Sequence, residues 1–141
     1  MIREILIACT VFAALGCAST VPPLTETAVD WTAVADEAIP EIVTQDADGE
    51  ERVTKLWLVV LDGEGLIRTG DSRWYRNIER DPNVVFRVGG HAYPLRAEVV
   101  TDELLVERAN TAFREKYGWQ DWMIHPFGEP DTNLMRLVPR E

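Results

Sequence analysis

The feature that most constrains the fold is the apolar run LWLVVL at residues 56–61, which lies between two tight-turn sequences. The turn sequences are DADG at residues 46–49 and DGEG at residues 62–65, and Asp-Gly pairs of this kind are typical of hairpins. A strand with one wet face alternates apolar and polar residues, so an unbroken apolar run indicates burial on both faces. We therefore expect a strand over residues 52–61 inside a barrel or a covered sheet.

The rest of the chain predicts further short strands and a few helices. Alternating or extended patterns predict strands over residues 41–45, 66–69, 84–88, 91–100 and 133–138. Helical spacing and capping residues predict helices over about 30–38, 72–80 and 101–117. Short antiparallel strands joined by tight turns are typical of small barrels. The expected fold is mainly β (α+β): a closed or nearly closed antiparallel barrel of about six strands with two or three flanking helices.

The first residues carry an export pattern. An uncharged, mostly apolar run follows Arg3 over residues 5–15, which is far shorter than the roughly 20 residues of a membrane-spanning helix and fits a signal peptide. The following sequence AALGC, residues 13–17, resembles the lipobox of bacterial lipoproteins. That resemblance implies a signal peptide over residues 1–16 and a lipidated Cys17. An ordinary secretory peptide cut nearby is the alternative.

The lipobox reading also divides the rest of the chain. Residues 17–29 are rich in Pro, Thr and Ala and read as the lipidated cysteine and a tether, and residues 30–141 form the folded domain. Ala18 after the cysteine implies the periplasmic side of the outer membrane, if the organism has one. The expected partner is the membrane, through the lipid on Cys17.

Charge and cysteine content exclude several classes of function. The net charge of −10 argues against a nucleic-acid partner, which would need a basic surface. The charge is uneven, however, since residues 52–87 hold seven Arg and Lys against five Asp and Glu. This basic island would either receive a small anion or form scattered surface ion pairs. With Cys9 and Cys17 used or removed, and only His91 and His125 besides, we expect no metal site.

One segment has the composition of an anion site. Residues 68–74 (RTGDSRW) lie where a strand is expected to lead into a helix N-terminus, whose free N–H groups favour an anion. Arg68 and Arg73 add charge, Thr69 and Ser72 add hydroxyl groups, and Gly70 permits close backbone approach. Asp71 opens an alternative, because as the helix N-cap it would satisfy those N–H groups without a ligand.

The stretch over residues 55–102 resembles the split β-barrel superfamily that binds flavin mononucleotide (FMN) or deazaflavin. That superfamily includes the pyridoxamine-phosphate-oxidase-like proteins and the deazaflavin-dependent nitroreductases, and within it the likeness is closer to the DUF2255 proteins. The resemblance covers about residues 31–140. It implies FMN or deazaflavin F420 as the cofactor and a homodimer as the assembly.

The resemblance also implies roles for individual residues. Thr69, Ser72 and Arg73 match the phosphate contacts of flavin-binding relatives, and Arg52 and Lys55 match basic residues of the preceding hairpin in deazaflavin relatives. Trp74 would pack near the ring system or, as the plainer alternative, in the core. The complete expected cofactor site is Arg52, Lys55, Arg68, Thr69, Gly70, Ser72, Arg73 and Trp74.

Two functions follow from these observations. The first is an oxidoreductase in which a flavin or deazaflavin passes hydride to a small organic acceptor while the protein supplies position and electrostatics. The second is a non-catalytic split-barrel module that has lost its cofactor and binds a small ligand or a partner at the envelope. No twin-arginine pair precedes the apolar run, so export in the unfolded state would require the cofactor to be acquired outside the cytoplasm.

Overall fold

The computed structural model describes residues 21–37, 39–124 and 132–141. In these ranges one antiparallel sheet is accompanied by helices, so the expected mainly β, α+β architecture is confirmed. The strands are β1 (Glu41–Gln45), β2 (Glu51–Lys55), β3 (Leu58–Leu61), β4 (Glu64–Thr69), β5 (Asn83–Val88), β6 (His91–Val99) and β7 (Asn133–Pro139). The helices are α1 (Trp31–Val34), α2 (Arg73–Arg80), α3 (Glu103–Tyr117) and α4 (Trp119–Ile124).

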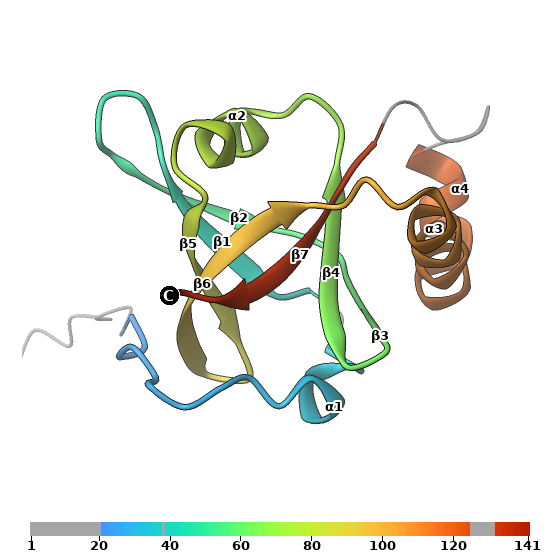
Figure 1. The fold of residues 1–141 in the computed structure, drawn as a ribbon, viewed down its shortest axis with the longest axis horizontal. Helices are drawn as coiled ribbons and strands as arrows, with labels where there is room; N and C mark the ends of the chain where they lie inside the picture. The colour runs from blue at the N-terminus through green and yellow to red at the C-terminus, as the bar shows by residue number, and fades with distance from the viewer. Residues whose placement is uncertain (1–20, 38, 125–131) are drawn as a thin grey trace, which may run out of the picture.

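The sheet curls into a split barrel, and its strand order shows why. The order is β2-β1-β5-β6-β7-β4-β3, so β2 and β3 are the two edges of the sheet. Only Leu56 and Trp57 join these edges, and the three residue steps from Lys55 to Leu58 span at most about 11 Å. The two edges must therefore approach one another at this end of the sheet, which we call the seam (Figure 1).

The strand count differs from the expectation at this seam. The run over residues 52–61 was expected to be one strand, but it forms two strands, β2 and β3, on opposite edges. β2 pairs with β1 and β3 pairs with β4, and no described pairing joins β2 to β3. The sheet therefore has seven strands in the described residues instead of about six, because residues 56 and 57 leave one edge and enter the other.

The apolar run is buried on both faces, as expected. Leu58 is fully buried in the barrel interior among the inward-facing residues of the other strands. Its neighbour Val59 points to the opposite face, where it packs against Phe113 and Tyr117 of α3. The barrel core and the layer under α3 thus share β3 and β4, so an alternating polar residue in this run would have no wet side.

Three helices close the barrel at different places (Figure 1). α2 and α1 lie at opposite ends, and α3 lies along the outside of β3 and β4. α2 presents Trp74 and Ile78 to the barrel core, as its apolar spacing predicted. Its Asn77 side chain donates hydrogen bonds to Thr44 Oγ1 at 3.0 Å and to Asp46 Oδ1 at 2.8 Å, which fix the helix on β1 and its turn.

The segment before α1 runs against the domain. The backbone N–H of Thr25 donates to the carbonyl of Ala92 in β6 at 2.7 Å, and Val29 packs against the barrel core. The described end of the predicted tether is thus in contact with the barrel. Within the described ranges, none of the helices combines the length and apolar character needed to cross a bilayer. Residues 1–20, including Cys17, lie outside the described residues.

Candidate functional site

A cavity of about 350 Å³ opens at the seam of the barrel. It lies where β2 leads into β3, where β4 leads into α2, and beside the residue that precedes β7, so three separate chain segments meet around it. We call it the seam pocket, and its lining residues are Lys55, Leu56, Trp57, Arg68, Thr69, Gly70, Trp74 and Thr132. Five of these belong to the expected cofactor site: Lys55, Arg68, Thr69, Gly70 and Trp74.

The strand register explains how distant residues meet there. β3 pairs with β4 so that Leu58 lies opposite Ile67, and one step further along brings Trp57 beside Arg68. Ile67 faces the barrel interior and Arg68 faces α3, since successive side chains alternate across a strand. Arg68 and Thr69, successive residues at the end of β4, therefore reach the pocket from opposite faces of the sheet.

Arg68 is held in place under α3. Only 8% of its surface is exposed, and its Nη1 donates a hydrogen bond to Asn110 Oδ1 at 2.8 Å. Its guanidinium carbon lies 4.3 Å from the ring centroid of Phe113, which is a cation–π contact. A buried guanidinium in this position places fixed positive charge at the wall of the seam pocket.

Thr69 and Ser72 form a hydroxyl pair at the start of α2. Thr69 Oγ1 donates to Ser72 Oγ at 3.0 Å, and Ser72 Oγ accepts from the backbone N–H of Tyr75 at 3.2 Å. Ser72 is therefore the N-cap of α2, so the alternative in which Asp71 fills that role is wrong. The Asp71 carboxylate instead accepts from Arg76 Nε at 2.9 Å on the exposed side of the helix.

Three of the expected cofactor residues do not line the seam pocket, and two of them, Arg52 and Arg73, lie beside a common acid. Arg52 makes a bidentate ion pair with Asp46, with Nε and Nη2 donating at 2.8 and 2.7 Å. The hydrogen bonds from Arg52 and Asn77 hold the pKa of Asp46 far below its ordinary value. Arg73 lines a neighbouring hollow of about 330 Å³ that also includes Asp46 and Asp48. Ser72, the third such residue, does not line the pocket but is bonded to Thr69, which does.

Three lining residues escaped the sequence analysis: Leu56, Trp57 and Thr132. Trp57 is half-buried and stacks on Tyr117 of α3, with ring centroids 4.4 Å apart and an interplanar angle of 10°. It was counted as part of a buried apolar run, whose pattern contains no sign of an opening. The only available signal was the indole itself, the one large aromatic ring in that run.

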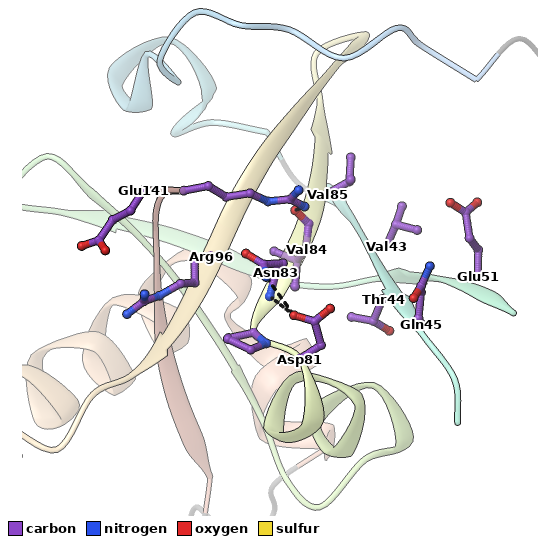
Figure 2. Close-up of a pocket in the computed structure, with 12 residues that line it drawn as sticks. Val43, Thr44, Gln45, Glu51, Asp81, Asn83, Val84, Val85, Arg96 and Glu141 are labelled. Carbon is purple, nitrogen blue, oxygen red and sulfur yellow. Dashed lines mark hydrogen bonds between the residues drawn. The ribbon is translucent and has the colours of Figure 1, made fainter. Parts of the chain in front are cut away.

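A second cavity, of about 600 Å³, lies on the outer side of β1, β5 and β6 and includes none of the expected site residues (Figure 2). Both arginines that line it are already engaged with protein partners. Arg96 pairs with Glu98 at 2.8 Å, and Arg140 donates to the carbonyls of Val84 and Leu95 at 2.7 and 3.1 Å. The Arg140 bonds hold the segment after β7 against β5 and β6, which is a structural role.

The remaining candidates give no chemical site within the part of the chain that the structure describes. Among the described residues, no group of three or more His, Cys, Asp or Glu side chains is arranged to hold a metal ion. His91 is exposed at the start of β6, with its ring 6.0 Å from that of Tyr93. Trp119 is 68% exposed on α4. His125 and Phe127 lie outside the described residues, as does the side chain of Trp122.

Comparison with known proteins identifies the fold but no sequence relative. No protein-family model matches the chain, so the closer likeness to the DUF2255 proteins stays an expectation. A search of curated proteins gives no match either.

Solved structures do share the fold. The F420-H2 dependent reductase FDR-A matches with a TM-score of 0.58 and 18% identity over 72% of this chain and 94% of its own. HutZ, the heme storage protein of Vibrio cholerae, matches with a TM-score of 0.60 and 19% identity over 78% and 87%. A FAD-binding protein of Mesorhizobium loti matches with 0.56 and 16% over 82% and 91%. The chain therefore has the split β-barrel fold found in FMN- and F420-binding proteins, as its resemblance implied.

Proposed function

We propose that the seam pocket binds a phosphorylated flavin, either FMN or the deazaflavin F420. The observation that carries this proposal is the meeting of Lys55 from one segment with the adjacent Thr69 and Gly70 from another, beside two tryptophans. A cavity of about 350 Å³ falls at the lower end of the roughly 300–1,000 Å³ typical of ligand pockets. An F420-H2 dependent reductase and a FAD-binding protein have the same fold, which supports a ligand of this class.

The lining residues fit the two ends of such a ligand. The Lys55 ammonium group, the Thr69 hydroxyl and the Gly70 backbone suit a phosphate, with Arg68 adding positive charge from beneath. An ordinary Cβ at Gly70 would meet no atom within 4 Å, so the space beside its backbone is open to a ligand. Arg52, Ser72 and Arg73 then flank the phosphate end without lining the cavity.

The chemistry proposed for the bound flavin is hydride transfer to a small organic acceptor. The described lining of the seam pocket contains no carboxylate and no imidazole. The protein's own part is therefore to hold the phosphate, orient the ring and exclude water from one face. Turnover of the reduced cofactor with small quinones and nitro compounds measures this activity, and binding without any turnover would identify a non-catalytic module.

We also propose that the chain is exported and lipid-anchored to the bacterial membrane at Cys17, on the periplasmic side of the outer membrane if the organism has one. The support is the AALGC sequence and the short apolar run before it. Metabolic labelling with a palmitate analogue tests the anchor, since Cys17→Ala should abolish the label. Unchanged labelling of Cys17→Ala would show that the lipid is attached elsewhere. Absence of label on the wild-type chain would instead favour an ordinary secretory signal peptide.

The homodimer also stays a prediction, and the mass of the purified protein in solution measures it.

The cofactor test is titration of the full chain with FMN, F420 and heme separately. We expect micromolar binding of a flavin, seen as a change in its fluorescence. Failure of both flavins to bind at micromolar concentration would contradict the proposal, and so would a heme Soret shift without flavin binding, as the shared fold of HutZ makes heme the relevant competitor.

A matched pair of variants tests the phosphate end. Lys55→Ala should weaken FMN binding by about 1.5–3 kcal/mol, the scale of a charged hydrogen bond. Arg73→Ala removes the same charge from the neighbouring hollow and should weaken binding less, because Arg73 lies outside the pocket. A larger loss from Arg73→Ala than from Lys55→Ala would place the phosphate at the start of α2 instead.

A further inference from the structure

A continuous row of contacts runs under one wall of the seam pocket. Arg68 lies over the Phe113 ring at 4.3 Å, and the Phe113 and Tyr117 rings lie 6.2 Å apart at an angle of 22°. Tyr117 in turn stacks on Trp57 at 4.4 Å. Both ends of the row, Arg68 and Trp57, line the pocket, while its middle belongs to α3. One helix therefore sets the positions of a cation and an aromatic ring in the same wall.

The stacked pair is anchored to the backbone at the start of β3. The Tyr117 hydroxyl accepts from the N–H of Leu58 at 2.9 Å and also lies 3.2 Å from its carbonyl oxygen as a donor. Lys116 donates to that same carbonyl at 2.8 Å, with its Nζ 5.3 Å from the Tyr117 ring centroid. These bonds tie the end of α3 to the residue that follows Trp57, so the orientation of the indole is fixed before any ligand arrives.

The two tryptophans of the pocket are not equivalent. Trp74 is only 8% exposed and packs among the barrel-core residues, so most of its ring surface is already covered by protein atoms. Trp57 is half-buried, with one face covered by Tyr117. The opposite face and the ring edge are what Trp57 can present to the cavity.

We propose that Trp57 is the surface on which the planar ring of the bound ligand packs, and that the stack on Tyr117 positions it for this. The inference rests on the proposed function and deepens it, since it selects a ligand with both an anionic end and a planar ring over a simple sugar phosphate. An aromatic side chain that is already held in one orientation favours binding, because it loses no rotamer freedom when the ligand packs on it. Alanine substitution of aromatic residues on which nucleic-acid bases stack typically costs about 1–3 kcal/mol, or about 5- to 150-fold in affinity, and a flavin ring is a planar heterocycle of the same kind.

The experiment compares ligands with and without a ring on matched variants of the full chain. FMN is titrated by its fluorescence, and ribose 5-phosphate is titrated by its competition with FMN. Trp57→Leu removes the proposed packing surface, and Trp57→Phe keeps an aromatic ring and controls for folding. Trp119→Leu removes an indole that is 68% exposed on α4 and is the composition control. Tyr117→Phe keeps the ring but removes its bonds to Leu58.

We expect Trp57→Leu to bind FMN at least tenfold more weakly than the wild type and to lose the quenching of flavin fluorescence that stacking causes. Trp57→Phe should recover most of both, while the affinity for ribose 5-phosphate stays the same in all these variants. Tyr117→Phe should reduce the quenching with a smaller loss of affinity, which is the mark of a positioning residue. Trp119→Leu should behave as the wild type.

Wild-type affinity and quenching in Trp57→Leu, with binding of FMN intact, would overturn this inference and leave the proposed function standing. An equal loss of ribose 5-phosphate binding would also overturn it, because Trp57 would then support the phosphate end or the fold. A wild-type chain that binds no flavin would overturn the proposed function first and this inference with it.

Discussion

Arg52 is joined to Asp46 by two hydrogen bonds, Nε to Oδ1 at 2.8 Å and Nη2 to Oδ2 at 2.7 Å. This ion pair spans the β1–β2 hairpin, and Asn77 of α2 adds a third bond to the same carboxylate at 2.8 Å. Asp46 thereby connects the hairpin to the helix that closes the barrel. The pair also commits the Arg52 side chain to a structural partner, which separates it from Lys55 three residues later in β2.

The ion pair predicts a specific loss of stability in acid. The bonds from Arg52 and Asn77 depress the pKa of Asp46 in the folded protein, whereas an unfolded Asp has a pKa of about 3.9. The unfolded state therefore binds the proton first as the pH falls, so the stabilisation is complete above about pH 4 and is lost below it. Asp46→Asn should lower the urea midpoint at pH 7 and lower it progressively less as the pH falls through this range.

Asp48→Asn is the control for that experiment, because it removes one negative charge from the same turn without breaking the Arg52 pair. The Asp48 carboxylate accepts from the N–H of Glu50 at 3.0 Å. A difference between Asp46→Asn and the wild type that is the same at pH 7 and pH 3 would show that the Arg52 pair is not the source of the acid sensitivity.

At the start of α2, we expect alanine substitutions at two neighbouring positions to differ in their effect on stability. Ser72 is the N-cap and bonds the Tyr75 N–H, so Ser72→Ala should destabilise the fold by about 1 kcal/mol. Asp71 pairs with Arg76 on the surface, with side chains 77% and 59% exposed, so Asp71→Ala should change stability by less than about 0.5 kcal/mol. Chemical denaturation of both variants at pH 7 measures the difference. The reverse order would restore Asp71 as the cap.

Local sequence patterns predicted the helices and strands of this fold well where the pattern within a single element decides which side chains are buried. Unbroken apolar residues correctly indicated two-sided burial at Leu58 and Val59, and the Trp74–Ile78 spacing identified the buried side of α2. The break at Leu56 and Trp57 had no local sign, because it depends on which strands take the two edges of the sheet. Edge choice is decided by partners elsewhere in the chain, such as β7 beside β4.

The lining of the seam pocket was predictable in part: its basic and hydroxyl residues and Trp74 were expected, whereas Trp57 was not. Thr69 and Lys55 were identified through the family resemblance, and the structure places both at the seam. Trp57 could not be identified, because its role depends on a stack with Tyr117, 60 residues away along the chain. Likewise, the ion pair between Asp46 and Arg52 depends on the hairpin register and on Asn77, and amino-acid composition determines neither of these.

The close approach of Gly65 in β4 to Trp31 in α1 predicts that a larger residue at position 65 destabilises the fold. A Cβ added at Gly65 would overlap the six-membered ring of Trp31, which itself packs on Phe86 of the barrel core at 5.7 Å between centroids. Gly65→Ala should therefore destabilise the fold by about 1–3 kcal/mol, as overpacking does. In a Trp31→Leu background the same change should cost less, which a double-mutant cycle measures. Gly70→Ala is the control, since its added Cβ meets nothing within 4 Å.

The contacts of Lys116 predict that removing its ammonium group lowers the stability of the fold. Its Nζ donates to three carbonyl oxygens, those of Ala35 at 2.8 Å, Glu37 at 2.9 Å and Leu58 at 2.8 Å. It thus joins the end of α3 to the segment after α1 and to the first residue of β3. Lys116→Met keeps the length of the side chain and leaves these oxygens without that donor. The expected loss of unfolding free energy is about 1–3 kcal/mol.

Chemical denaturation at pH 7 measures that loss, with Glu115→Gln as the control on an exposed neighbouring position of the same helix. Hydrogen exchange adds a local readout, because the N–H of Leu58 is bonded to the Tyr117 hydroxyl and should exchange faster when the end of α3 loosens. A Lys116→Met variant as stable as Glu115→Gln, with Leu58 protected as in the wild type, would show that Tyr117 alone holds α3 on β3. In that case the orientation of Trp57 would depend on the Tyr117 stack and hydroxyl without help from the lysine.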